Sequence, residues 1–132
     1  MYLLDTNVWV AFLRHANSPV VQRLKSKVVS DVCTCSVVVA ELRYGCLRSA
    51  KPGANLTNIR SLLQPYRSLA FDDAAADHFA RIRRQLESQG MMIGPFDLQI
   101  ASIAIANGCT LVTHNTREFS RVTGLALEDW ET

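Results

Sequence analysis

The chain has 132 residues, of which 48% are hydrophobic and 20% are charged. This size and composition are typical of one soluble globular domain, residues 1–132, and argue against a disordered chain. The net charge of +2 neither marks nor excludes a nucleic-acid-binding protein. No apolar run reaches the roughly 18–20 residues of a membrane span, and Asp5 interrupts the stretch where a signal peptide would continue. We therefore expect a cytoplasmic protein with no membrane contact.

Strand and helix patterns alternate in the first half of the chain. Tyr2–Leu4 is short and apolar, which favours a buried strand. Asp5 and Thr6 are favourable residue types for the N-terminus of a helix that continues over Val8–Leu13. Further along we expect a helix with Val20, Val21 and Leu24 on its apolar face, a strand over Val32–Cys35, and a helix over Val37–Leu47 that Ser36 caps.

The second half continues the alternation. The expected elements are a helix with Leu56, Ile59 and Leu63 on one face, a strand over Leu69–Phe71, a helix from Ala75 to Leu86, an apolar helix over Phe96–Ala106 and a strand over Thr110–Thr113. Alternating strands and helices predict an α/β fold in which helices cover both faces of a parallel sheet. In such sheets ligands bind at the carboxyl ends of the strands, where Asp5 and Asn115 lie.

The four cysteines fit reduced thiols in the cytoplasm. Cys33 and Cys35 lie two residues apart in a predicted strand, so their side chains point to one face, and we expect them in the core. The three histidines show no zinc-type spacing with each other or with the cysteines.

Three carboxylates stand in apolar surroundings: Asp5 after Tyr2-Leu3-Leu4, Glu41 after Val37-Val38-Val39-Ala40, and Asp97 in the segment Pro95-Phe96-Asp97-Leu98. Each has a simpler explanation, since Asp5 and Asp97 could cap helices and Glu41 could face solvent. If the fold brings them together, their charges repel and their pKa values rise unless a cation neutralises them. A cation that prefers oxygen ligands, Mg²⁺ or Mn²⁺, would suit the cluster.

The neighbouring polar residues complete the candidate site. Thr6 and Asn7 would hydrogen-bond near Asp5 and fix the direction of its carboxylate. Asn7 also stands where a phosphatase of the haloacid-dehalogenase type needs a second Asp, which argues against that class. Arg43, Arg117 and Arg121 would either bind phosphates or form salt bridges with nearby acids.

Four motifs, "YLLDTNVWV", "VVVAELRYG", "GPFDLQIA" and "LVTHNTREFSRVTGL", together resemble the PIN-domain ribonuclease toxins of the VapC family, from bacterial type II toxin–antitoxin operons. The motifs stand in the family's order and at its spacing from Tyr2 to Trp130. The resemblance implies a three-layer α/β/α domain around a central parallel sheet. It also implies a Mg²⁺-dependent endoribonuclease (Mn²⁺ a plausible substitute) that cleaves tRNA or another structured RNA and is inhibited by a VapB-type antitoxin.

Carried over by motif, Asp5, Glu41 and Asp97 are the catalytic acids, with Asp5 and Asp97 as principal metal ligands and Glu41 completing the cluster. Many PIN domains place a further acid just after the last strand, where this chain has Asn115. An amide carries no charge, so a second stable metal ion is in question. Glu118 could compensate for the missing charge as a residue that supports the site, or it could lie on the surface.

The expected reaction is hydrolysis of a phosphodiester bond by an activated water, which leaves a 5′-phosphate and a 3′-hydroxyl. Glu41 or Asp97 would accept the proton of that water. Val8, Trp9 and Phe12 would either line a groove for the antitoxin or pack in the core, and the family resemblance implies a homodimer. The substitution at Asn115 keeps one alternative open, a non-catalytic PIN-like protein that binds RNA or a partner.

Overall fold

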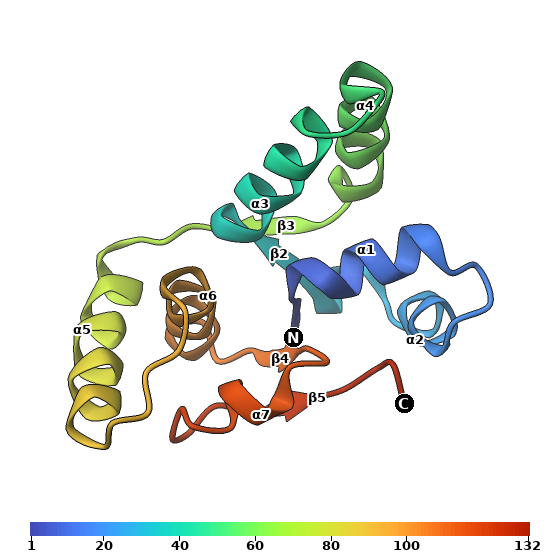
Figure 1. Cartoon of the computed structure of the whole chain (residues 1–132). Coiled ribbons are helices and arrows are strands. Elements are labelled where there is room, and N and C mark those ends of the chain that lie inside the picture. Colours follow the sequence, from blue (N-terminus) through green and yellow to red (C-terminus); the bar gives the residue numbers. More distant parts are fainter.

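The computed structural model covers residues 1–132 and contains one sheet of five parallel strands in the order β3-β2-β1-β4-β5 (Figure 1). The strands are β1 (Tyr2–Leu4), β2 (Val32–Cys35), β3 (Arg67–Leu69), β4 (Thr110–Val112) and β5 (Leu127–Glu128). The strand β1 lies at the centre, with Leu3 opposite Cys33 of β2 and Leu111 of β4. This places the residues that follow β1 and β4 side by side.

Helices cover the two faces of the sheet, so the expected three-layer α/β/α arrangement is confirmed (Figure 1). On one side lie α1 (Thr6–Arg14) and α2 (Pro19–Ser26), and on the other lie α5 (Asp73–Ser88) and α6 (Pro95–Ala106). The helices α3 (Ser36–Leu47) and α4 (Pro52–Leu63) form a hairpin that projects beyond the sheet, and the single turn of α7 (Thr116–Phe119) lies beside β5. A short 3₁₀ helix, η1 (Val29–Asp31), precedes β2.

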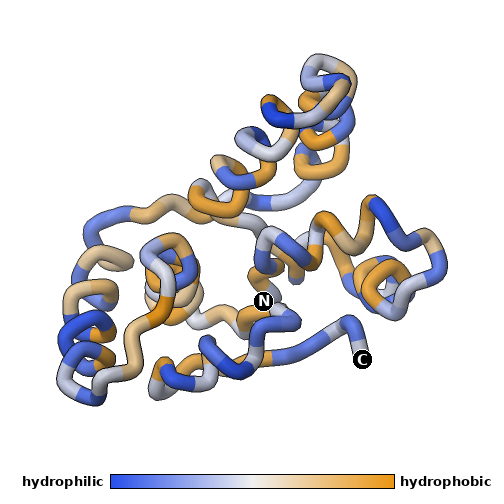
Figure 2. Tube along the Cα trace, viewed as in Figure 1, coloured by the Kyte–Doolittle hydropathy of each residue, from blue (hydrophilic) through white to orange (hydrophobic).

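The core is apolar and continuous from the strands into the inner helices. The helix α6 is hydrophobic over most of its surface and buries Leu98, Ile100 and Ile103 between the sheet and α5, which is hydrophilic on its outer side (Figure 2). Trp9 is fully buried, with its ring 5.1 Å from that of Tyr66 in an edge-to-face arrangement. Burial of these side chains holds α1 and α6 against the sheet by the hydrophobic effect.

Several sequence-based expectations need correction. The third strand covers Arg67–Leu69 rather than Leu69–Phe71, because this edge strand pairs through the backbone of two exposed residues that show no apolar pattern. Ser36 does not cap α3, since its hydroxyl accepts the backbone N–H of Phe71 at 3.3 Å. The sequence showed no signal for β5 or α7, which are two and four residues long.

All four cysteines are buried. Cys33 and Cys35 are buried in the core as expected, and all four thiols are free. No helix combines the length and the apolar character needed to cross a lipid bilayer.

Candidate functional site

Asp5 lies at the carboxyl end of the central strand, where β1 passes into α1. Its backbone N–H donates to the carbonyl of Val112 at 2.9 Å, so the sheet register places the residue. Its carboxylate accepts the backbone N–H of Thr6 at 2.7 Å and the hydroxyl of Thr113 at 2.9 Å. Burial raises the pKa of Asp5, the two hydrogen bonds oppose that rise, and the charge of Glu41 adds to it. Asp5 therefore caps α1 and also belongs to a group of acids.

Glu41 lies in the middle of α3, beyond the end of β2, and is half-buried. Its carboxylate accepts the hydroxyl of Thr6 at 2.7 Å. Thr6 thus links the first two acids, since its N–H donates to Asp5 and its hydroxyl donates to Glu41. The orienting role expected for Thr6 agrees with these contacts.

Asp97 lies in the first turn of α6, which begins at Pro95 after Gly94. Proline suits the first position of a helix because its φ angle is already helical and no N–H is lost there. Burial raises the pKa of Asp97 to about 6, and the charges of Asp5, Glu41 and Glu118 contribute to the rise. These interactions show that the fold brings the three predicted acids into one electrostatic cluster.

Glu118 is the fourth member of this acid cluster, which is one of the two positions that the sequence left open for it. It is half-buried in α7, and its carboxylate accepts the Asn115 side-chain amide at 3.2 Å. Its charge also raises the pKa of Asp97. We define the acid cluster as Asp5, Glu41, Asp97 and Glu118.

Thr113 is a residue that the sequence reasoning missed. It is fully buried directly after β4, and its hydroxyl donates to Asp5 while accepting the backbone N–H of Asn115 at 3.0 Å. One hydroxyl therefore connects the central acid to the turn that holds Asn115 and Glu118. The sequence offered one signal for this role, because Thr113 is a polar residue that directly follows an apolar strand.

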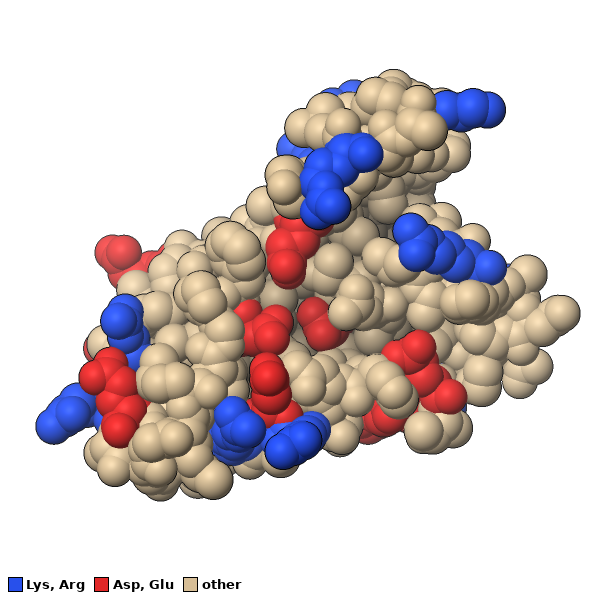
Figure 3. All heavy atoms as spheres, in the orientation of Figure 1, with Lys and Arg blue, Asp and Glu red and all other residues tan.

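The charge of the acid cluster is not compensated by the protein. None of the four acids forms a salt bridge with a lysine or an arginine. Figure 3 shows acidic side chains gathered in the hollowed centre of one face, with basic side chains around its rim. All possible metal ligands in the cluster are carboxylate oxygens, which suit a hard divalent cation such as Mg²⁺.

A second group of possible ligands lies apart from these acids. The ligand atoms of His114, Asp129 and Glu131 all lie within 4.8 Å of one another, which is the only such set of three in the chain. In the acid cluster, therefore, no three carboxylates have ligand oxygens that all lie within 4.8 Å of one another. This spacing is compatible with Mg²⁺, because the ion usually keeps several waters and binds only one or two carboxylates. His114 Nδ1 lies 3.0 Å from a carboxylate oxygen of Asp129, a contact that an ordinary hydrogen bond explains.

The other predicted residues lie around the acid cluster. Asn7 is exposed and its side chain makes no hydrogen bond, so it does not orient Asp5 in this structure. Arg43 and Arg117 are exposed and form no salt bridge, which leaves both guanidinium groups available. Arg121 donates to the carbonyl of Met92 at 3.0 Å and so has a structural contact.

The raised pKa of Asp97 predicts how stability depends on pH. The pKa of Asp97 in the folded chain, about 6, exceeds its ordinary value of 3.8, so the folded chain binds the proton of this carboxyl group more tightly than the unfolded chain does. The stability that comes from this proton is fully present below pH 3.8 and is lost as the pH rises through 6. With EDTA present, we expect Asp97→Asn to match wild type near pH 4 and to be about 1–2 kcal/mol more stable near pH 7. Urea denaturation at several pH values measures this difference, and a difference that stays constant with pH would contradict the prediction.

Comparison with known proteins identifies the family. The model of the PIN domain matches residues 2–125. The chain is 40% identical to the tRNA(fMet)-specific endonuclease VapC of Shigella flexneri, over 98% of this chain and 97% of that protein, and 35% identical to ribonuclease VapC2 of Haemophilus influenzae over the same shares. The crystal structure of DNA-bound VapBC from Salmonella typhimurium matches with a TM-score of 0.92 and 33% identity, over 98% of this chain and 97% of that one. The chain belongs to the PIN-domain family and, within it, to the VapC ribonucleases.

Proposed function

We propose that this protein is the toxin of a VapBC toxin–antitoxin system, a metal-dependent endoribonuclease that acts in the cytoplasm. The observation that carries the proposal is the acid cluster, which gathers uncompensated carboxylates in a hollow at the carboxyl ends of β1 and β4. The names of the similar proteins support the same activity. We infer a structured RNA as the substrate and choose tRNA first, because a relative with 40% identity is named as tRNA-specific.

In this proposal Asp5 and Asp97 hold the metal ion, and Glu41 completes its surroundings directly or through a water. A bound Mg²⁺ or Mn²⁺ would lower the pKa of a water and offset the negative charge that develops on the phosphate. Asp5 is fixed by the Thr6 N–H and the Thr113 hydroxyl, so it would keep its position during the reaction. A rigid ligand of this kind reduces the reorganisation needed at the transition state.

Proton transfer in the reaction would fall to Asp97 or Glu41. A bound cation would lower the pKa values that burial and mutual repulsion raise, so the base would be whichever of these two carboxylates meets the ion through a water. It would accept the proton of the attacking water as the bond from phosphorus to the 3′ oxygen breaks, which leaves a 5′-phosphate and a 3′-hydroxyl. The free guanidinium groups of Arg43 and Arg117 would bind phosphates of the RNA backbone.

We also infer a VapB-type antitoxin as the partner that inhibits the enzyme. Similar structures from Salmonella typhimurium and Rickettsia felis are of VapBC bound to DNA. For the three residues that could line an antitoxin groove or pack in the core, the structure buries Val8 and Trp9 fully in the core and leaves Phe12 half-buried. The homodimer stays a prediction from the family resemblance.

Removal of the metal ion tests the proposed activity. Purified, antitoxin-free protein is incubated with total cellular RNA in Mg²⁺ or in EDTA, and the new 5′ ends are mapped. We expect discrete cuts with 5′-phosphates in Mg²⁺, loss of these cuts in EDTA, and their return with excess Mg²⁺ or Mn²⁺. Cleavage that survives EDTA would contradict the mechanism. A folded protein that binds RNA but never cleaves it would favour the non-catalytic alternative.

A further inference from the structure

A groove opens beside the acid cluster, between α1 and the α3–α4 hairpin. Its volume is about 1290 Å³, larger than the roughly 300–1,000 Å³ of a typical small-molecule pocket. Thr6 and Glu41 line it, so one part of the groove reaches the acids. A groove of this size at a proposed nuclease site can hold more of the substrate than the phosphate that is cleaved.

Two aromatic rings are exposed in this groove. Tyr44 is 59% exposed and Phe96 is 57% exposed, and both line the groove. Tyr44 stands three residues after Glu41 on α3, and Phe96 directly precedes Asp97 at the start of α6. Each ring is therefore carried by the same helix as one member of the acid cluster. An aromatic ring exposed to water carries an energetic cost that binding of a flat apolar surface would remove.

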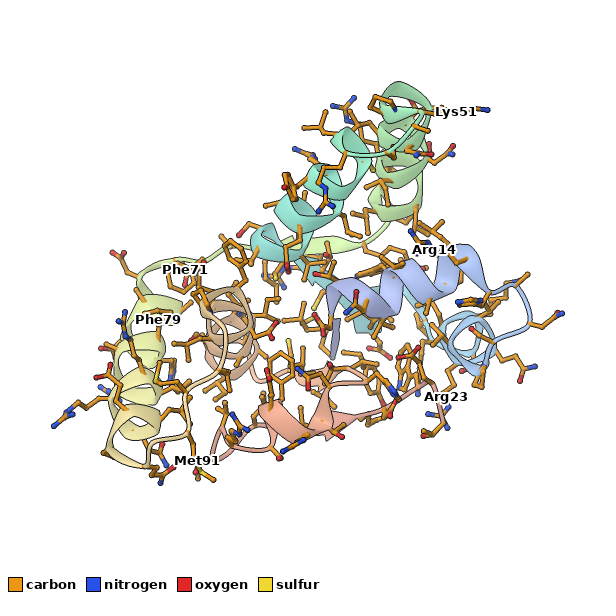
Figure 4. The ribbon with its side chains drawn as sticks, in the orientation of Figure 1. Arg14, Arg23, Lys51, Phe71, Phe79 and Met91 are labelled. Atoms are coloured by element: carbon orange, nitrogen blue, oxygen red, sulfur yellow. The ribbon has the colours of Figure 1, made fainter.

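Positive charge accompanies the rings. The guanidinium carbon of Arg48 lies 5.4 Å from the centre of the Tyr44 ring, which is the geometry of a cation–π contact. Arg14 lies at the end of α1 and also lines the groove (Figure 4). Neither arginine forms a salt bridge with an acid. The groove thus combines aromatic faces with unpaired cations, which complements a nucleic-acid chain with its bases and phosphates.

We propose that Tyr44 and Phe96 are stacking residues that bind unpaired bases on either side of the cleaved phosphodiester bond, while Arg48 binds a backbone phosphate. This inference rests on the proposed ribonuclease function and adds residues that position the substrate. Stacking needs only the flat face of a base, so the two rings would favour unpaired nucleotides over a duplex whose bases are already stacked. RNA is favoured over a protein segment because the groove meets the acids that would bind the cleaved phosphate.

The test is a binding measurement in EDTA, so that no RNA is cleaved. The probe is an unstructured 12-nucleotide RNA that contains 2-aminopurine, whose fluorescence falls when the base stacks on an aromatic ring. We expect wild type to quench the fluorescence and to bind this RNA more tightly than the same RNA in a duplex. Tyr44→Ala and Phe96→Ala should each weaken binding about 10-fold and reduce the quenching. Tyr44→Phe and Phe96→Trp should restore both.

Leu47→Ala is the matched control, because Leu47 is 63% exposed on the same helix as Tyr44 and does not line the groove. We expect it to bind like wild type. In Mg²⁺, with tRNA as substrate, the two alanine variants should raise KM about 10-fold with little change in kcat, because stacking holds the substrate before and during the reaction.

Three results would overturn the proposal: alanine variants that bind as wild type does, quenching that persists without either ring, or equal affinity for the duplex. Variants that bind and cleave RNA normally but escape inhibition by a VapB-type antitoxin would assign the rings to a protein partner and would also overturn it. Failure of the nuclease function is distinguishable, since it appears as absence of cuts by wild type in Mg²⁺, whereas the stacking result is read in EDTA.

Discussion

Asp5→Asn is expected to reduce RNA cleavage by about 1000-fold or more while the chain stays folded. The substitution removes the negative charge at the centre of the acid cluster and so weakens the hold on a divalent cation. It keeps the shape of the side chain, and asparagine is as good an N-cap as aspartate, so the amide oxygen can still accept the Thr6 N–H. Cleavage rates under single-turnover conditions measure the effect.

The matched control for this experiment is Asp77→Asn. Asp77 is an exposed acid on α5 that pairs only with Arg81, outside the acid cluster. We expect it to cleave RNA at the wild-type rate. If Asp5→Asn retained more than about a tenth of wild-type activity, Asp5 would be a helix cap and not a metal ligand.

The largest expected change in stability follows Trp9→Ala. Trp9 is fully buried on α1 and packs edge-to-face on Tyr66, so truncation removes a large apolar contact and leaves a cavity. We expect the free energy of unfolding to fall by about 3–5 kcal/mol. The indole N–H of Trp9 has no hydrogen-bond partner. Trp9→Phe should cost about half as much, because it keeps an aromatic ring in the core and, like Trp9→Ala, removes no hydrogen bond.

Urea denaturation measures both Trp9 variants against Leu13→Ala, a control on the same helix at a side chain that is 48% exposed. We expect the control to stay within about 0.5 kcal/mol of wild type. A loss below about 1 kcal/mol for Trp9→Ala would mean that this side chain is not part of the core and would return it to the list of candidate groove residues.

The main elements of the fold were predictable because their patterns are strong. The apolar residues of α5 recur at helical spacing, and Pro95 and Gly108 mark the two ends of the apolar helix α6. The strand β3 was displaced by two residues because Arg67 and Ser68 are exposed at the sheet edge, where backbone pairing places few demands on side chains. The pair Leu127–Glu128 of β5 is too short to form any periodic pattern.

The acids of the candidate site could be named from the sequence because carboxylates in apolar surroundings are costly and therefore conspicuous. The hydrogen bonds that connect these acids could not be predicted from the sequence. The Thr6 hydroxyl reaches an acid 35 residues away and the Thr113 hydroxyl reaches one 108 residues away, so both contacts depend on the register of the sheet. The position of Glu118 stayed open for a similar reason, since only the turn after β4 decides whether it faces the acids or the solvent.

The order in which the acids occur along the chain has a consequence for synthesis. The acid cluster draws on residues 5, 41, 97 and 118, and the ring of Trp130 packs 5.5 Å from that of Tyr2 in the central strand. The edge strand β5, Leu127–Glu128, follows all four acids along the chain. A chain still being translated would lack Glu118 and β5 until those residues have emerged from the ribosome, so the proposed cleavage of RNA would start only after residues 118–128 have been made.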